Sequence, residues 1–121
     1  MKKAEIRKIV LAQRTQLGEK EFLERSLRVI EKLAPLLTPG KTIASFKAIP
    51  HRNEISLDSL EGKFAFPRVI SAAEGSMEMA VSTMFANSAW GIPEPLGGTV
   101  VKPTDFDIVL IPLLAFDKYG H

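Results

Sequence analysis

Three cations near the N-terminus have the spacing of a shared binding surface. Lys3, Arg7 and Arg14 project at about 0°, 40° and 20° on a helical wheel, because each residue of an α-helix turns by about 100°. The apolar residues of the same segment lie beside this stripe, at about 240° to 340°; they are Ile6, Ile9, Val10 and Leu17. A cation at the margin of a buried face can extend its charged group into a cleft and bind phosphate oxygens. The stripe therefore predicts an anion site, and the alternative is pairing with Glu side chains around the core edge.

The charge of the chain is unevenly distributed. Residues 1–32 carry nine Lys and Arg against five Glu, and the remaining residues carry seven against nine acidic residues. This polarity suggests an anionic partner near the N-terminus, or simply two solvated lysine-rich helices. The net charge of +2 is modest, and only Trp90 and Tyr119 offer rings other than Phe for base stacking. We therefore expect no nucleic-acid partner.

Length and composition indicate one globular domain, residues 1–121. Hydrophobic residues make up 45% and charged residues 25%, as in ordinary globular proteins. The apolar run at residues 108–116 contains Pro112 and is far shorter than the roughly 20 residues of a membrane-spanning helix. The start resembles no secretory signal, and there is no cysteine. We expect a cytoplasmic protein with no membrane partner.

The first half of the chain predicts two helices and a strand. A second helix follows the cationic one, separated from it by Gly18; its apolar positions are Leu23, Leu27, Ile30 and Ala34. Residues 42–46 are apolar and β-branched, which predicts a short buried strand. Residues 53–62 predict a short helix with Asn53 as N-cap and Gly62 beyond its end.

The second half predicts mainly strands. Residues 63–67 form a strand that Pro67 stops, and residues 76–85 alternate as in a half-exposed strand. Residues 87–103 hold three prolines and three glycines, which predicts a long ordered loop. Residues 106–113 are apolar on both faces, as in the centre of a parallel sheet. Helices that lead into such strands favour an α/β protein with a three-layer sheet.

Several short motifs occur in a characteristic order along almost the whole chain. They are K-A-E-I-R, N-E-I, F-P-R, M-E-M, W-G-I-P-E-P and P-L-L-A-F-D-K-Y-G. In this order they resemble the 5-formyltetrahydrofolate cyclo-ligase family, also called methenyltetrahydrofolate synthetase. The resemblance implies a Rossmann-like, mostly parallel three-layer sheet with two N-terminal helices. It also implies ATP- and Mg²⁺-dependent conversion of 5-formyltetrahydrofolate to 5,10-methenyltetrahydrofolate.

The resemblance implies roles for residues in the first half of the chain. Lys3 and Arg7 match the family's contacts to the ATP phosphates, and Arg14 lies on the same stripe. Glu54 matches an acidic substrate residue that accepts hydrogen bonds from the pterin; the alternative is an acid at a helix N-terminus. The segment from Lys47 to Glu54 departs from the family pattern by its greater length, which leaves its register open.

Two residues of the second half are candidates for the folate pocket. Trp90 stands where some relatives place an aromatic wall for folate, and its alternative is a loop anchor. Met77 would line the same pocket or pack in the core. We expect Asp117 to organise the turn after the last strand, and His51 and His121 match no catalytic position. The sequence assigns no catalytic residue and no metal ligand.

One family motif is not found. The resemblance implies a glycine-rich R-L-G-x-G-x-G-x-Y-D stretch directly after A-F-D-K-Y-G, which wraps the ATP phosphates and helps to hold Mg²⁺. We therefore expect a sheet that is incomplete at the C-terminus and an activity that is impaired in this chain alone. An exposed strand edge would favour a homodimer through residues 108–116. The alternative is a short, non-catalytic relative that binds folate, a nucleotide or a protein partner.

Overall fold

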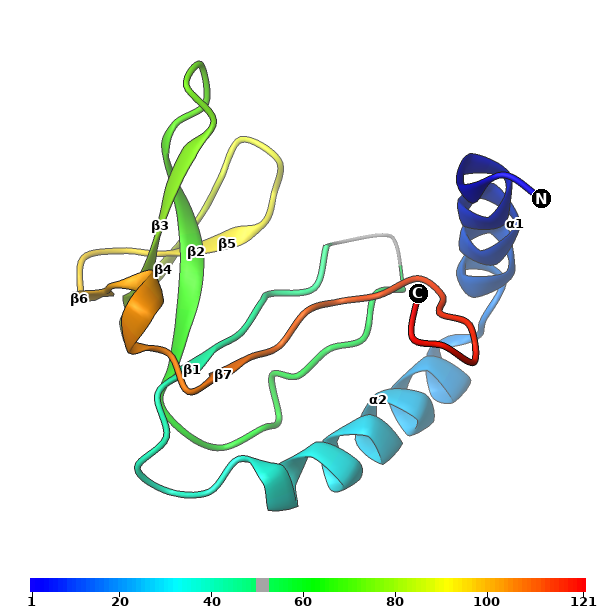
Figure 1. Cartoon of the computed structure of the whole chain (residues 1–121), viewed down its shortest axis with the longest axis horizontal. Coiled ribbons are helices and arrows are strands. Elements are labelled where there is room, and N and C mark those ends of the chain that lie inside the picture. The colour runs from blue at the N-terminus through cyan, green and yellow to red at the C-terminus, as the bar shows by residue number, and fades with distance from the viewer. Residues whose placement is uncertain (50–52) are drawn as a thin grey trace.

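The computed structural model describes residues 1–49 and 53–121 (Figure 1). Two helices open the chain, as predicted: α1 spans Lys3–Thr15 and α2 spans Glu19–Leu33. Gly18 is the N-cap residue of α2, and a short 3₁₀-helix, η1 (Ala34–Leu36), follows α2. No helix of the described ranges is long and apolar enough to cross a membrane.

A five-stranded mixed sheet has the order β6-β3-β2-β1-β7. Its strands are β1 (Ile43–Ala44), β2 (Phe64–Ser71), β3 (Ser76–Val81), β6 (Thr99–Val101) and β7 (Ile108–Val109). Strand β1 pairs in parallel with β2 and β7, whereas β2–β3 and β3–β6 are antiparallel. The predicted α/β class is confirmed, but a mostly parallel Rossmann-like sheet is not, because half of the strand pairings are antiparallel.

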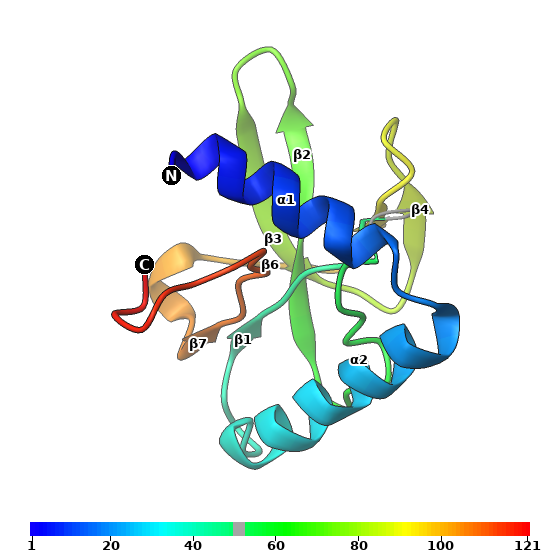
Figure 2. The ribbon, with the colours of Figure 1, turned by 90° about the vertical axis from the view of Figure 1, so that its right-hand side faces the viewer.

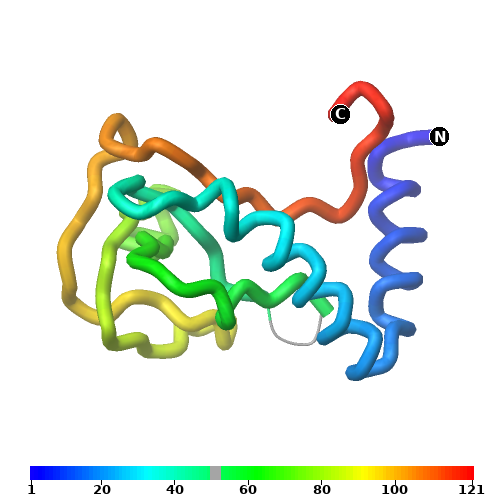
Figure 3. The backbone as a smooth tube through the Cα atoms, turned by 90° about the horizontal axis from the view of Figure 1, so that it is seen from below, coloured from blue at the N-terminus to red at the C-terminus, as the bar shows by residue number. Residues whose placement is uncertain are grey.

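Both helices lie on the same side of the β2–β3 hairpin (Figure 2). Helix α2 runs along the extended segments that follow β1 and β7, and the chain end lies close to the start of α1 (Figure 3). The described part of the chain therefore has no helical layer on the other side, and the predicted three-layer arrangement is not confirmed.

The core is small and belongs mainly to the first three strands. The buried apolar residues are Ile43, Ala44, Leu57, Phe64, Ala65 and Ala80. Helix α2 adds a buried serine, Ser26, whose Oγ accepts a hydrogen bond from the Ser56 N–H at 3.3 Å. The predicted apolar face of α2 is turned outward in part, since Leu23 and Leu27 are about half exposed. The prediction failed there because α2 has apolar residues on two faces, and the pattern does not say which face packs.

Helix α1 packs little against the remaining structure. None of its residues, all of which the structure describes, is buried. Ile6 and Ile9, expected on the buried face beside the cationic stripe, are exposed. The predicted helix is confirmed, but the burial of its apolar face is not.

Strand β2 continues through Pro67 to Ser71, so the prediction that Pro67 ends the strand is wrong. The Ala65 carbonyl accepts a bond from the Ser45 N–H on the β1 side. Two residues later, the Pro67 nitrogen faces the same side, where pairing with β1 has already ended. The proline therefore removes no ladder hydrogen bond, which is the condition under which a strand tolerates it.

The short helix predicted at residues 53–62 is absent from the described structure, which has turns and bends there. Asn53 has a left-handed backbone conformation, with φ of 47°, which asparagine tolerates better than most residues. Its side-chain Nδ2 donates to the carbonyl oxygens of Arg14 at 2.9 Å and Leu17 at 3.3 Å. Asn53 thus satisfies carbonyls at the end of α1 instead of starting a new helix.

The loop predicted at residues 87–103 contains regular structure. Strand β5 (Pro93–Pro95) pairs with β4 (Phe85–Asn87) in a separate two-stranded sheet, and β6 joins β3 of the main sheet. A 3₁₀-turn, η2 (Pro103–Asp105), follows. The prediction of a central strand at residues 106–113 is also wrong for the described chain, because β7 has two residues and lies at the sheet edge.

Candidate functional site

An apolar groove of about 580 Å³ lies between α2, residues 54–57 and the segment that begins at β7. Its lining consists of Val29, Leu33, Phe46, Glu54, Ile55, Leu57 and residues 109–116. Among these described lining residues Glu54 alone is ionisable. A groove of this kind favours a flat, largely apolar ligand with a few polar groups at one position.

Glu54 is half-buried at the wall of the groove. Its Oε1 accepts a hydrogen bond from the Ile49 N–H at 3.4 Å. This long contact leaves acceptor positions of the carboxylate available to N–H donors of a ligand. The alternative interpretation, an acid at the start of a helix, is excluded because the structure has no helix at this position.

Arg14 lies in the last turn of α1 and is half-buried. Its backbone carbonyl accepts the bond from Asn53, the residue that directly precedes Glu54. The structure therefore brings the end of the cationic helix next to the segment that carries Glu54. Residues 50–52, which include His51, lie outside the described residues, so the Lys47 to Glu54 segment is described only at its ends.

Lys3 and Arg7 are exposed on the N-terminal half of α1. Within the described ranges, neither side chain forms a hydrogen bond or ion pair, so pairing with Glu side chains is not observed for them. Both cations are thus accessible to an anion from solvent. Neither lines the groove around Glu54.

Trp90 and Met77 also lie outside the groove. Trp90 is 82% exposed in the turn between β4 and β5, which is in a different part of the molecule from α1 (Figure 1). Met77 is exposed on β3, opposite Val69 of β2. In the described structure, therefore, Lys3, Arg7, Trp90 and Met77 do not share a pocket with Glu54, and their roles remain predictions.

Sequence reasoning missed the roles of several polar residues. Asn53, predicted as a helix N-cap, instead ties the end of α1 to the segment that carries Glu54, and its left-handed backbone is one that asparagine tolerates. Arg68 and Glu78, in the F-P-R and M-E-M motifs, form an ion pair at 2.7 Å. Among residues 1–49 and 53–121, no group of three or more His, Cys, Asp or Glu residues could hold a metal ion.

The segment that begins at the edge strand β7 and continues to residue 116 exposes apolar side chains. The exposed residues are Val109, Ile111, Leu113 and Phe116, with exposures of 57% to 75%. This is the surface on which the predicted homodimer depends, and dimerisation remains a prediction.

Asp117 organises the turn beyond this edge, as expected. Its Oδ1 accepts bonds from the N–H groups of Tyr119 and His121, each at 2.9 Å. The His121 ring, for which the sequence offered no role, lies 3.1 Å from the second carboxylate oxygen. The His121 N–H in particular lowers the pKa of Asp117 below its ordinary value of 3.8.

The fold is shared with two solved enzymes. A solution NMR structure of 5,10-methenyltetrahydrofolate synthetase from Aquifex aeolicus matches with a TM-score of 0.82 and 30% identity, over 97% of this chain and 63% of that one. A 5,10-methenyltetrahydrofolate synthetase from Mycoplasma pneumoniae matches with a TM-score of 0.71 and 26% identity, over 98% of this chain and 68% of that one. No protein-family model and no curated protein matches the sequence.

Proposed function

Because this chain belongs to the 5,10-methenyltetrahydrofolate synthetase (5-formyltetrahydrofolate cyclo-ligase) family, we propose that it serves the ATP-dependent closure of 5-formyltetrahydrofolate to 5,10-methenyltetrahydrofolate. The observation that carries the proposal is the match to the Aquifex enzyme over 97% of the chain. The chain spans 63% of that enzyme, so the activity of the whole enzyme is part of the proposal.

The proposed reaction activates a poor leaving group. The formyl oxygen attacks the γ-phosphorus of ATP, and ADP leaves. The neighbouring folate nitrogen then attacks the formyl carbon, loses its proton to solvent, and inorganic phosphate departs with the former formyl oxygen. Such phosphoryl transfer depends mainly on positioning and on cations around the phosphates.

Each predicted site residue has a proposed part in this chemistry. Lys3 and Arg7, with Arg14 on the same stripe, would neutralise the phosphate charge. Glu54 would accept hydrogen bonds from the amino and ring N–H groups of the pterin. Trp90 would stack on a folate ring, and Met77 would contact it. These residues do not line one pocket in the described structure, so we propose that the 121-residue chain alone turns over slowly.

The residues described here do not fit a magnesium site. No cluster of three or more possible ligands occurs among them, and we assign no step to a metal held by this chain. Mg²⁺ would enter the reaction with the nucleotide, whose phosphate oxygens are its usual ligands.

A second candidate function is a non-catalytic binding module. The groove around Glu54 favours it, because an apolar cleft with one carboxylate can bind a flat ring with N–H donors without any chemistry. The proposed occupant is folate, and a nucleotide or an apolar protein segment are the alternatives.

The direct test follows the absorbance of the methenyl product after mixing the chain with ATP, Mg²⁺ and 5-formyltetrahydrofolate. We expect a rate about 100-fold or more below that of a longer family member. Calorimetric titration of each substrate separates the two candidate functions, since binding without turnover supports the module. If the chain binds neither substrate, both candidate functions are contradicted.

Glu54→Gln sharpens this test, with Glu61→Gln as its matched control. Glu61 is exposed on the same segment and does not line the groove. We expect Glu54→Gln to weaken folate binding about 10-fold, because a charge-assisted hydrogen bond is lost. We expect Glu61→Gln to leave the affinity unchanged.

A further inference from the structure

The two-stranded β4–β5 sheet cannot attach to the main sheet through N–H groups of its prolines. The Leu96 N–H donates to the Met84 carbonyl, so the backbone groups of Leu96 and of Glu94, two residues earlier, face β4. Those of Pro93 and Pro95 face away from β4, and neither proline has an N–H. On this side, β5 offers carbonyl acceptors and no donor.

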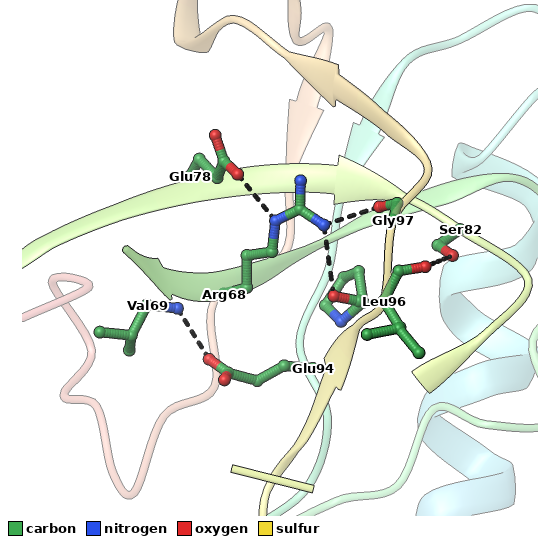
Figure 4. Close-up of polar contacts among 8 residues, drawn as sticks. Arg68, Val69, Glu78, Ser82, Glu94, Leu96 and Gly97 are labelled. Atoms are coloured by element: carbon green, nitrogen blue, oxygen red, sulfur yellow. Dashed lines mark hydrogen bonds and ion pairs between the residues drawn. The ribbon is translucent and has the colours of Figure 1, made fainter. Parts of the chain in front are cut away.

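Arg68 of β2 supplies the missing donors (Figure 4). Its Nη1 donates to the carbonyl oxygens of Pro95 at 3.3 Å and Gly97 at 2.6 Å. Its Nε donates to Glu78 of β3 at 2.7 Å, directly opposite in the strand register. The side chains of Arg68 and Glu78 are only 22% and 29% exposed. Because the guanidinium is planar and held by Glu78, its other N–H groups point in a fixed direction.

Glu94 makes a second attachment, in which a side chain of β5 accepts a hydrogen bond from the backbone of β2. Its Oε2 accepts a hydrogen bond from the Val69 N–H of β2 at 2.8 Å (Figure 4). The end of the segment is tied as well, because Ser82 Oγ donates to the Leu96 carbonyl at 2.8 Å. Side chains thus replace a backbone ladder between β5 and the main sheet.

The segment held in this way carries Trp90, the single tryptophan of the chain. A tight turn joins β4 to β5, with bonds from the Ser88 N–H to the Ile92 carbonyl and from the Gly91 N–H to the Ser88 carbonyl, each at 2.9 Å. The Trp90 ring itself is largely exposed. The position of the indole therefore depends on β5, and that of β5 on Arg68 and Glu94.

We propose that Arg68 and Glu94 are positioning residues that fix the β4–β5 sheet and thereby hold Trp90 as a flat face for a ring of the folate substrate. The folate part of this inference rests on the proposed function. Lysine cannot replace Arg68, because a single guanidinium serves three acceptors in two directions and an ammonium on a flexible stem does not.

Arg68→Lys tests the attachment, and Arg25→Lys is its matched control. Arg25 forms a pair with Glu21 at 2.7 Å, but both side chains are about half exposed on α2. We expect amide exchange at Leu96 and Ser88 to accelerate about 10-fold or more in Arg68→Lys only. The single Trp90 indole N–H resonance reports any loosening of the turn. Equal exchange rates in wild type and Arg68→Lys would overturn the attachment.

Glu94→Gln and Glu94→Ala give an independent pair of variants. Glutamine keeps an acceptor oxygen for the Val69 N–H and should largely preserve the exchange rates, whereas alanine should raise them. Circular dichroism confirms that each variant is folded. Similar amide exchange rates in both variants would show that Glu94 does not position the β4–β5 sheet.

Calorimetric titration with 5-formyltetrahydrofolate tests the functional part. We expect Arg68→Lys to weaken binding about 10-fold through the displaced Trp90 face. Unchanged affinity with accelerated exchange would overturn the positioning role and leave the proposed function standing. If the wild-type chain binds no 5-formyltetrahydrofolate, the proposed function fails, and the exchange rates still decide the attachment.

Discussion

Two regions of the molecule differ in how many of their side chains have partners within the described chain. Where β5 meets β2 and β3, Arg68, Glu78 and Glu94 are all matched to partners, at 2.6 to 3.3 Å. Around α1 and the segment after β7, Lys3 and Arg7 have no ion pair within the described residues, and Ile111 and Phe116 are exposed at 68% and 75%. One region stabilises itself, whereas the other presents charged and apolar surfaces outward.

This difference separates stability from binding. Among the described residues, the buried apolar ones other than Leu57 lie in β1, β2 and β3, so changes near these strands should alter mainly the free energy of unfolding. Changes around α1, the groove and β7 should alter mainly association with ligands or with another chain.

The largest expected effect on stability comes from Gly98→Ala. Gly98 has φ of +82°, and a Cβ there would overlap the Val81 carbonyl oxygen and the Ser82 side chain. We expect a loss of about 3 kcal/mol in the free energy of unfolding, measured by urea denaturation. Gly97→Ala is the control, since Gly97 has φ of +66° but nothing within 4 Å of its Cβ position. It should lose about 1 kcal/mol from backbone strain alone, and equal losses would contradict the close approach of this segment to β3.

The next effect concerns the exposed edge beside β7. If this surface mediates self-association, Ile111→Lys should raise the dimer dissociation constant about 10-fold or more, because one buried apolar side chain is lost. Analytical ultracentrifugation measures it, and Ile70→Lys is the control, since Ile70 is similarly exposed, at 62%, but lies on β2. A monomer at high concentration, or equal effects of both variants, would refute dimerisation through this edge.

Asn53 ties the end of α1 to the segment that carries Glu54, and it has a smaller expected effect. Asn53→Gly keeps the left-handed backbone but removes both side-chain bonds to the end of α1. We expect a loss of about 1–2 kcal/mol in the free energy of unfolding and faster amide exchange in α1. An unchanged exchange rate in α1 would show that another contact holds the helix.

The sequence predicted those elements whose pattern is local. Helices α1 and α2 and strand β3 follow directly from periodicity, and the family motifs led to Glu54. The pattern failed where a distant partner decides. Pro67 stays in β2 because β1 has already ended on that side, and Asn53 faces the end of α1 instead of starting a helix. The attachment of β5 by Arg68 and Glu94 likewise depends on residues about 25 to 29 positions apart.

The smallest expected effect is a local pH dependence at Asp117. Hydrogen bonds from the backbone N–H groups of His121 and Tyr119 stabilise the carboxylate and lower its pKa below 3.8. The stabilisation of this turn is therefore present above about pH 4, and is lost as the pH falls through the lowered pKa. NMR titration should show the Tyr119 and His121 amide signals shifting with a midpoint below 3.8. Asp117→Asn should abolish that transition, and a midpoint above 3.8 would contradict the assigned cause.

The central claim is that the cationic stripe of α1 binds the phosphates of ATP. The direct measurement is a calorimetric ATP titration of the Lys3→Gln/Arg7→Gln double variant beside a Lys2→Gln/Lys8→Gln double variant, which removes the same charge from the same end of the chain. We expect the first pair to weaken ATP binding at least about 10-fold, because charge-assisted contacts are lost, and the second to change it little. Equal weakening of ATP binding by both pairs would indicate general electrostatic attraction to α1 and not a specific site at the stripe. Unchanged ATP affinity in the Lys3→Gln/Arg7→Gln variant would contradict the claim.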